Sequence, residues 1–387
     1  MEETTTNKIR QQLVTSLPLP TLPFDLIIEI LCRLPVKLLS QLRCVCKSFN
    51  SLISDSKFAK KHLSFSTTLH RLLVSNDHSG LVLFDTPIPS DFLTSSVTQS
   101  KFNYPNSLKI GSAYPRYVSS CDGILCLTMS QGSAVLWNPS IRKSKILPSL
   151  TLNSEDPSLS AYSFGYDHFI HNYKIVAISV FEDKSEVYVH SLGTHDWRRI
   201  QDFPYFGPRG PGIFVSGTVN WLMVEGFLNT SRFIVSLDLK KETYQKLSQP
   251  DLDNDSWTLG VSRDRLCIFS KSSRFLDVWI MNEYGNKESW TKLYRVPHRE
   301  DQGLCSHKKE AYMVDRGLYS YKKALYISKN DLLLMDFFEL DEWGGFTKIK
   351  LVVYHSITGT LKIADIENFS HWIHPQVYIE SLISPCS

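Results

Sequence analysis

The sequence predicts an α+β chain of two parts, a small N-terminal helical domain followed by a larger all-β domain. Apolar residues recur at helical spacing between Leu22 and Ile53, and short strand-like runs replace that period from about Leu63. Pairs of such strands then recur along the rest of the chain. We therefore expect a flexible tail at 1–16, a helical domain at 17–62 and a β-domain at 63–387.

The apolar residues of the first domain form two helical series that a proline separates. The first series is Leu26, Ile27, Ile30, Leu31 and Leu34, and the second is Leu38, Leu39, Leu42, Val45, Cys46, Phe49 and Leu52. Pro23 suits the first turn of a helix, while Pro35 disfavours helical geometry at the residue before it. A unit of about 40 residues buries too little surface to be stable alone, so we expect it to bind a protein partner.

Several short motifs in this domain together resemble the F-box. They are Leu22-Pro23, Asp25-Leu26, Glu29-Ile30, Arg33-Leu34-Pro35 and Arg43-Cys44-Val45-Cys46-Lys47. The resemblance implies binding to the Skp-type adaptor of a cullin–RING ubiquitin ligase. It implies an adaptor-binding surface made of Leu22, Pro23, Ile27, Ile30, Leu31, Leu34, Pro35, Val45, Cys46, Lys47 and Phe49. Phe49 stands where plant members often carry Trp, and an ordinary helical hairpin packed on the β-domain is the alternative interpretation.

Val, Ile, Leu and aromatic residues dominate the runs after Leu63, with Gly, Asn, Asp and Ser between them, which favours antiparallel sheet. An apolar strand, a polar turn and a return strand align at Trp137, Val189, Leu237, Ile280 and Val353, in steps of 52, 48, 43 and 73 residues. Such spacings are typical of four-stranded propeller blades. We expect six or seven blades, with a β-sandwich as the alternative, and packing between blades by Trp137, Trp197, Trp221, Trp279 and Trp290.

Further motifs resemble the F-box-associated domain that follows the F-box in many plant proteins. They are Ser120-Cys121-Asp122-Gly123, Leu136-Trp137-Asn138-Pro139-Ser140, Phe164-Gly165-Tyr166-Asp167, Tyr173-Lys174-Ile175-Val176, Val278-Trp279-Ile280-Met281 and Glu288-Ser289-Trp290-Thr291-Lys292-Leu293. One departure is HFIHN at 168–172, where members commonly carry more acidic residues. The resemblance implies a kelch-like propeller behind the F-box.

Composition excludes several classes of partner and location. The 42 Lys and Arg residues against 39 Asp and Glu give a net charge of +3 without a long basic block, so we expect no nucleic-acid partner. No apolar stretch reaches the roughly 18 residues that a membrane span needs. The first residues, MEETTTNKIR, do not fit a secretory signal, and the eight cysteines lie scattered in apolar runs. We expect a cytoplasmic or nuclear protein.

Known catalytic motifs are absent from the sequence: it has no nucleophile elbow, phosphate-binding loop, dinucleotide fingerprint or HExxH. His168 with His171 and His371 with His374 have a metal-like separation, but no nearby residues complete a ligand set. The prolines between Gly207 and Gly212 remove donors that a phosphate site would need, so we expect a turn between blades there. The sequence predicts no catalytic residues, no cofactor and no metal.

These expectations combine into a non-catalytic substrate receptor of a Skp–cullin–F-box ubiquitin ligase. The helical domain would bind the Skp-type adaptor and, through it, the cullin and the RING protein. The β-domain would bind an unknown target protein and hold its lysines near the conjugating enzyme. The alternatives are an adaptor-bound scaffold without ubiquitylation output and a kelch-like enzyme. Candidate target-binding loops are 86–107, 149–160, 204–212, 226–232 and 299–311.

Overall fold

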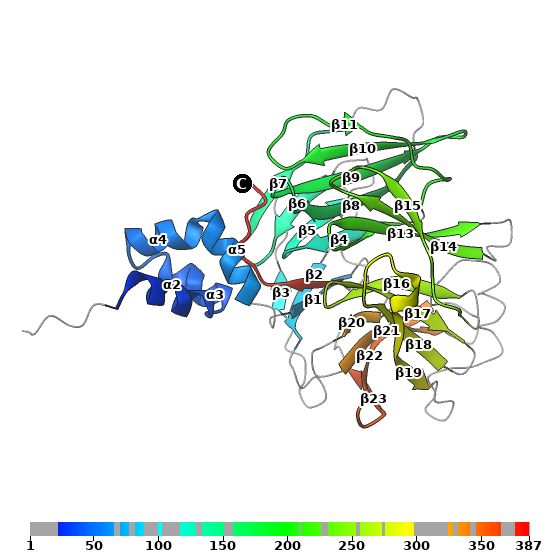
Figure 1. Cartoon of the computed structure of the whole chain (residues 1–387). Helices are drawn as coiled ribbons and strands as arrows, with labels where there is room; N and C mark the ends of the chain where they lie inside the picture. The colour runs from blue at the N-terminus through cyan, green and yellow to red at the C-terminus, as the bar shows by residue number, and fades with distance from the viewer. Residues whose placement is uncertain are drawn as a thin grey trace, which may run out of the picture.

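The N-terminal helices lie against one side of a β-propeller (Figure 1). The structure is a computed structural model that describes residues 22–65, 70–76, 82–88, 100–102, 117–128, 134–150, 158–208, 210–225, 231–252, 256–272, 275–297, 324–327, 332–340, 346–364 and 376–386. The helical domain and the β-domain predicted from the sequence are therefore both present.

Four helices make up the described part of the first domain. They are α2 (Phe24–Cys32), α3 (Val36–Leu42), α4 (Lys47–Ser54) and α5 (Ser56–Phe65). Pro23 and Pro35 occupy the N-cap positions of α2 and α3, as their fixed φ angles and missing N–H groups allow. The Asp55 side chain caps α5 by accepting from the backbone N–H groups of Lys57 at 2.8 Å and Phe58 at 3.0 Å. Each helix thus begins where the sequence provides a suitable residue.

The β-domain consists of antiparallel four-stranded sheets, and the described residues contain six of them. The first sheet joins β24 (Gln376–Ile379) to β1 (His70–Asn76), β2 (Val82–Pro87) and β3 (Ser100–Phe102). The second has β4 (Tyr117–Cys121), β5 (Ile124–Thr128), β6 (Ala134–Asn138) and β7 (Lys143–Ile146). The third has β8 (Ser158–Asp167), β9 (Asn172–Val180), β10 (Ser185–Ser191) and β11 (Arg198–Arg199).

The remaining three sheets repeat this order. The fourth has β12 (Ile213–Val215), β13 (Thr218–Glu225), β14 (Ser231–Asp238) and β15 (Tyr244–Leu247). The fifth has β16 (Trp257–Ser262), β17 (Arg265–Lys271), β18 (Phe275–Met281) and β19 (Trp290–Pro297), with the short 3-10 helix η2 (Lys287–Ser289) before β19. The sixth has β20 (Ala324–Ile327), β21 (Leu332–Leu340), β22 (Phe346–His355) and β23 (Thr360–Ala364).

The sheets close into a ring because the two ends of the β-domain share one sheet. The C-terminal strand β24 pairs with β1, with Leu72 opposite Val377. The innermost strands β24, β4, β8, β12, β16 and β20 contact one another in that order, and β20 returns to β24. This circular arrangement confirms the predicted propeller over the β-sandwich, and it leaves only short outer strands as edges. The described residues form six sheets, and the sequence predicted six or seven blades.

Tryptophans join neighbouring sheets, as predicted. Trp137 and Trp221 are each 1% exposed within the sheet cores. The indole N–H of Trp197 donates to the carbonyl of Pro148 at 2.9 Å, and that of Trp290 donates to the carbonyl of Ser248 at 3.0 Å. In both cases the Trp lies at the outer strand of one sheet, and its hydrogen-bond partner lies just after the outer strand of the preceding sheet. The indole therefore supplies apolar area to the core and a polar anchor between blades.

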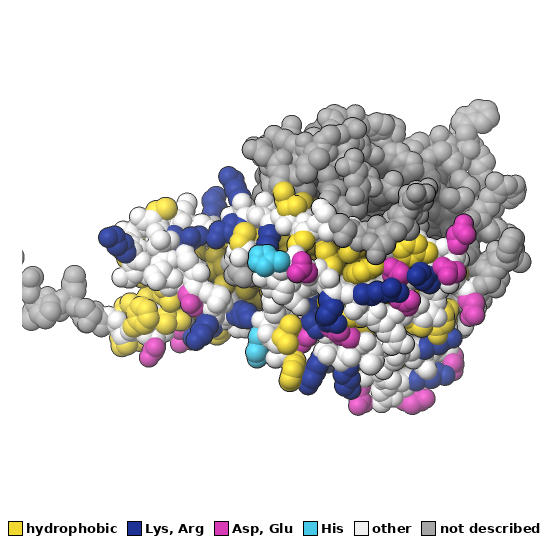
Figure 2. Space-filling view, turned by 90° about the horizontal axis from the view of Figure 1, so that it is seen from above, with side chains coloured by type: hydrophobic (Ala, Val, Ile, Leu, Met, Phe, Trp, Pro, Cys, Tyr) yellow, Lys and Arg dark blue, Asp and Glu magenta, His cyan; other side chains and the backbone are white. Residues whose placement is uncertain are grey.

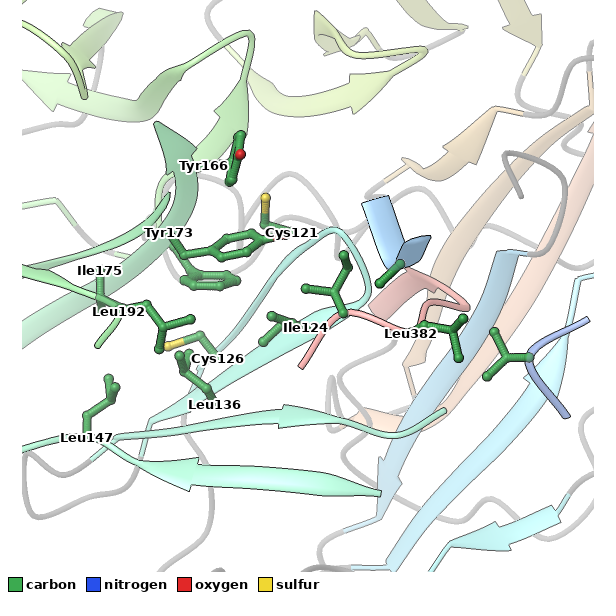
Figure 3. Close-up of a cluster of buried hydrophobic side chains, with 14 of the residues drawn as sticks. Cys121, Ile124, Cys126, Leu136, Leu147, Tyr166, Tyr173, Ile175, Leu192 and Leu382 are labelled. Carbon is green, nitrogen blue, oxygen red and sulfur yellow. The ribbon is translucent and has the colours of Figure 1, made fainter. Parts of the chain in front are cut away.

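One hydrophobic cluster connects the helical domain to the propeller. It runs from helix residues such as Leu39 and Phe58, through the C-terminal residues Leu382 and Ile383, to propeller residues such as Ile124 (Figure 3). The chain after β24 thus lies between the two domains and passes beside α5 (Figure 1). The helices are packed on the propeller rather than tethered to it.

Candidate functional site

Large apolar side chains are exposed on the helical domain, away from its core. Besides Phe65 at the end of α5, they are Leu22, Phe24, Leu26, Ile30, Leu38 and Val45, and the exposed fractions of these six are 53%, 57%, 46%, 50%, 45% and 67%. We call these six residues the apolar set. Figure 2 shows hydrophobic side chains gathered at this end of the molecule. Exposed patches of this kind mark surfaces that bind another protein.

The opposite faces of the same helices form the core of the domain. Leu31, Cys32, Val36, Leu39 and Ile53 are each at most 4% exposed and belong to the cluster that reaches the propeller. Burial raises the pKa of the Cys32 thiol, which therefore stays neutral as an apolar core group. The helix α2 is apolar on two sides, and within the described part of the chain only one of them is buried.

The structure places most of the predicted adaptor-binding residues at the surface. Leu22, Pro23, Ile30, Pro35, Val45, Cys46 and Lys47 are exposed, and Ile27, Leu34 and Phe49 are half-buried. Leu31 differs because it is 4% exposed and packs inward, so its contribution is to the stability of the domain rather than to an outward contact. Direct binding by these residues remains a prediction.

Three members of the apolar set were missed by the sequence analysis as binding residues. Leu26 and Leu38 were assigned to apolar stripes without a statement of which side they face, and Phe24 was not considered. The composition of α2, FDLIIEILC, could have predicted their exposure, because it has more apolar residues than one face of a helix can bury. A surplus of this kind indicates a second apolar face.

Hydrogen bonds hold the helices in a fixed arrangement behind the apolar set. The buried ring of His62 on α5 places Nε2 2.9 Å from the carbonyl oxygen of Leu34, at the junction of α2 and α3. The Cys46 thiol accepts from the backbone N–H of Phe49 at 3.5 Å and caps α4. The exposed pair Arg33 and Glu29, 2.9 Å apart, adds a polar border. Such ordering before binding lowers the entropy that a partner complex must lose.

The predicted target-binding loops are described only in part. The loop at 204–212 is described except for residue 209, and it exposes Phe206 at 71%. Its Gly212 N–H donates to the buried Ser163 hydroxyl at 2.8 Å, which fixes the loop on the neighbouring sheet. Most of 86–107, 149–160 and 226–232, and all of 299–311, lie outside the described residues.

The described part of the chain contains neither a metal-binding cluster nor a helix suited to a membrane. No group of three or more His, Cys, Asp and Glu side chains there is arranged to hold a metal ion. His168 and His171 lie in the turn between β8 and β9, while 371–374 lies outside the described residues. Among the described helices, none is both long and apolar enough to cross a membrane.

Comparisons with known proteins agree with this architecture. Residues 19–61 match the F-box domain family, and residues 72–385 match the family described as F-box associated beta propeller domain. F-box/kelch-repeat protein At3g23880 of Arabidopsis thaliana is 28% identical over 383 residues, covering 94% of this chain and 96% of that protein. F-box protein CPR1 of the same plant is 28% identical over 312 residues, covering 71% and 73% of the two chains.

An F-box followed by a propeller supports, in general, a substrate receptor of the Skp–cullin–F-box type. The chain belongs to the F-box associated beta propeller family and carries an F-box in front of that domain.

Proposed function

We propose that this protein is the substrate-recognition subunit of a Skp–cullin–F-box ubiquitin ligase. The F-box binds the Skp-type adaptor and thereby the cullin and the RING protein, while the propeller binds a target protein for ubiquitylation and degradation. The protein contributes no catalytic group, because holding lysines of the target near the charged conjugating enzyme is sufficient to accelerate transfer. We place this activity in the cytoplasm or nucleus.

The observation that carries the proposal is the apolar set. Burying a large apolar side chain stabilises a complex by about 1.5 to 3 kcal/mol. Burial of the six exposed side chains of the apolar set against a partner would therefore contribute substantial binding free energy. The inner faces of the same helices are already buried in the hydrophobic cluster that extends to the propeller, which leaves the outer faces for another protein. The F-box family match supports a Skp-type adaptor as that protein.

Co-purification with a Skp-type adaptor tests the proposal. We expect Ile30→Asp combined with Val45→Asp to reduce adaptor binding by at least about a hundredfold, since each change places a charge in a desolvated contact. Ile357→Asp is the matched control, because Ile357 is 78% exposed on the turn between β22 and β23. Undiminished binding by the double variant, with wild-type thermal stability, would refute the assignment of this surface.

A second experiment separates the receptor from a scaffold without ubiquitylation output. The complete chain, assembled with adaptor, cullin and RING protein, should increase ubiquitin transfer to proteins that co-purify with the propeller. The Ile30→Asp and Val45→Asp double variant should retain those proteins and lose the transfer. Equal transfer with and without adaptor binding would contradict the receptor function.

A further inference from the structure

A rigid apolar tip lies on the propeller in the turn between β8 and β9. Phe169 and Ile170 in this turn are 67% and 46% exposed. The Asp167 carboxylate accepts from their backbone N–H groups at 2.8 and 3.4 Å, and His171 closes the turn with φ +51°. The backbone is thus held in one conformation that keeps two neighbouring apolar side chains in water.

A buried ion network supports this tip from below. The Lys174 ammonium lies 2.9 Å from Asp167 and 3.1 Å from Glu242, with side chains 7%, 2% and 20% exposed. Glu242 belongs to the turn between β14 and β15 and also contacts Arg198 at 2.6 Å. Because each buried charge requires its partners, the turns of two neighbouring sheets are fixed to each other.

Two lysines beside this turn, Lys60 and Lys240, have no salt-bridge partner among the described residues. The Lys240 ammonium is 4.2 Å from the centre of the Phe169 ring, and the neighbouring acid, Glu242, is already bound by Lys174 and Arg198. On the other side, Lys60 of α5 donates to the Tyr166 hydroxyl at 2.8 Å. Within the described part of the chain, neither Lys60 nor Lys240 forms a salt bridge.

His168 connects the side chains that the two lysines contact, because it precedes Phe169 in the turn and packs on Tyr166. Its ring lies 5.0 Å from that of Tyr166, edge to face, and it is exposed. Lys60, His168, Phe169, Ile170 and Lys240 therefore form a continuous strip that begins on the F-box helix α5 and ends on the fourth sheet. We call these five residues the junction strip. It combines exposed apolar area with positive charge, and its backbone is already ordered.

We propose that the junction strip binds an acidic segment of the target protein that carries a bulky apolar side chain. The apolar side chain packs on Phe169 and Ile170, where an ordered aromatic residue has the properties of a binding hot spot. Carboxylates on either side pair with Lys60 and Lys240, which supply charge complementarity. The bound segment extends from the propeller to the F-box. That this segment belongs to a ubiquitylation target rests on the proposed function, whereas the binding chemistry does not.

Fluorescence anisotropy with a defined peptide tests the proposal on the complete chain, alone and bound to the Skp-type adaptor. The probe is a fluorescein-labelled peptide of Glu and Asp around one central Phe. Companion peptides replace the Phe by Ala or the acids by Lys. We expect the acidic Phe peptide to bind at least about tenfold more tightly than either companion, and binding to weaken as salt is raised.

Variants locate the binding surface. Phe169→Ala and Lys240→Glu should each weaken binding of the acidic Phe peptide by about tenfold or more. Ile357→Ala is the matched control: it removes an exposed apolar side chain from the turn between β22 and β23 in the sixth sheet, which belongs to no proposed binding surface. It should leave binding unchanged, and all three variants should unfold at the wild-type temperature because the altered side chains are exposed.

The outcomes distinguish this inference from the proposed function. Equal affinity for the three peptides, or an equal loss in Phe169→Ala and Ile357→Ala, overturns the junction strip even if the adaptor still co-purifies. Conversely, a chain that binds the acidic Phe peptide through Phe169 but fails to bind the adaptor supports the strip and refutes the receptor assignment.

Discussion

Asn138 connects the C-terminal chain to the second sheet, and its replacement by alanine should break this connection and destabilise the propeller. The side chain is fully buried, and its Nδ2 donates to the Ser381 carbonyl at 3.1 Å, the Ser381 hydroxyl at 3.0 Å and the Ile383 carbonyl at 2.8 Å. Its Oδ1 accepts from the Ser140 N–H at 2.9 Å. One amide thus satisfies four groups in a region with little water.

The expected loss of stability follows from those contacts. Each buried hydrogen bond contributes about 1 kcal/mol, and each polar group left unpaired costs about 1 to 3 kcal/mol. Allowing for rearrangement, Asn138→Ala should destabilise the protein by about 3 to 4 kcal/mol. Differential scanning calorimetry should then show an unfolding temperature lower by about 4 to 6 °C, given an unfolding entropy of about 2 cal/mol/K per residue.

The control for this prediction is an asparagine at the equivalent place of the fifth sheet. Asn282 follows β18 and donates to the Ser289 carbonyl at 3.2 Å and the Thr291 hydroxyl at 2.8 Å, but it is exposed. Water can replace those bonds, so Asn282→Ala should cost less than about 1 kcal/mol. Equal losses in the two variants would refute the view that the C-terminal chain closes the propeller through Asn138.

Three further outcomes are expected. Gly123→Ala should lower the unfolding temperature, since Gly123 has φ +81° and an added Cβ would clash with the Ile379 carbonyl oxygen; a wild-type melting curve would contradict this. Lys174→Met should cost about 3 to 5 kcal/mol in denaturant unfolding by leaving the buried Asp167 carboxylate without an ion-pair partner, more than Lys184→Met at an exposed pair. Hydrogen bonds from Arg295 lower the pKa of the Asp277 carboxyl in the folded protein. The ionised carboxylate therefore stabilises the folded protein at pH values above the pKa that Asp277 has in the unfolded chain. This stabilisation is lost as the pH falls through the lower pKa of the folded protein. Asp277→Asn should therefore flatten the acid limb of stability against pH, and an unchanged limb would exclude this carboxylate as a cause.

The sequence was sufficient for the helical domain and the propeller because both have strong local patterns. Pro23 and Pro35 define where helices begin, and turn residues with aromatic strands recur along the β-domain. The order of the strands in the first sheet could not be predicted, because β24 and β1 lie at opposite ends of the β-domain. No local period relates Leu72 to Val377.

The surface properties were harder to predict than the elements. Helical spacing placed Leu26, Ile30 and Leu31 on one stripe, yet the structure buries Leu31 and exposes the other two. Which face is buried depends on α5 and on the propeller, so it is a tertiary property. The junction strip was missed for the same reason, since Lys60 and Lys240 become neighbours of one turn only after folding.

The C-terminal chain has a consequence for how the two ends of the molecule work together. Leu382 and Ile383 belong to the cluster that contains both F-box and propeller residues, and the same segment closes the propeller through Asn138. The orientation of the F-box and the closure of the propeller therefore depend on one stretch of chain. A receptor that acts by proximity requires a fixed distance between its adaptor and its target, because a flexible connection would dilute the effective concentration of lysine near the conjugating enzyme. Packing the last residues between the domains provides that rigidity without a separate linker domain.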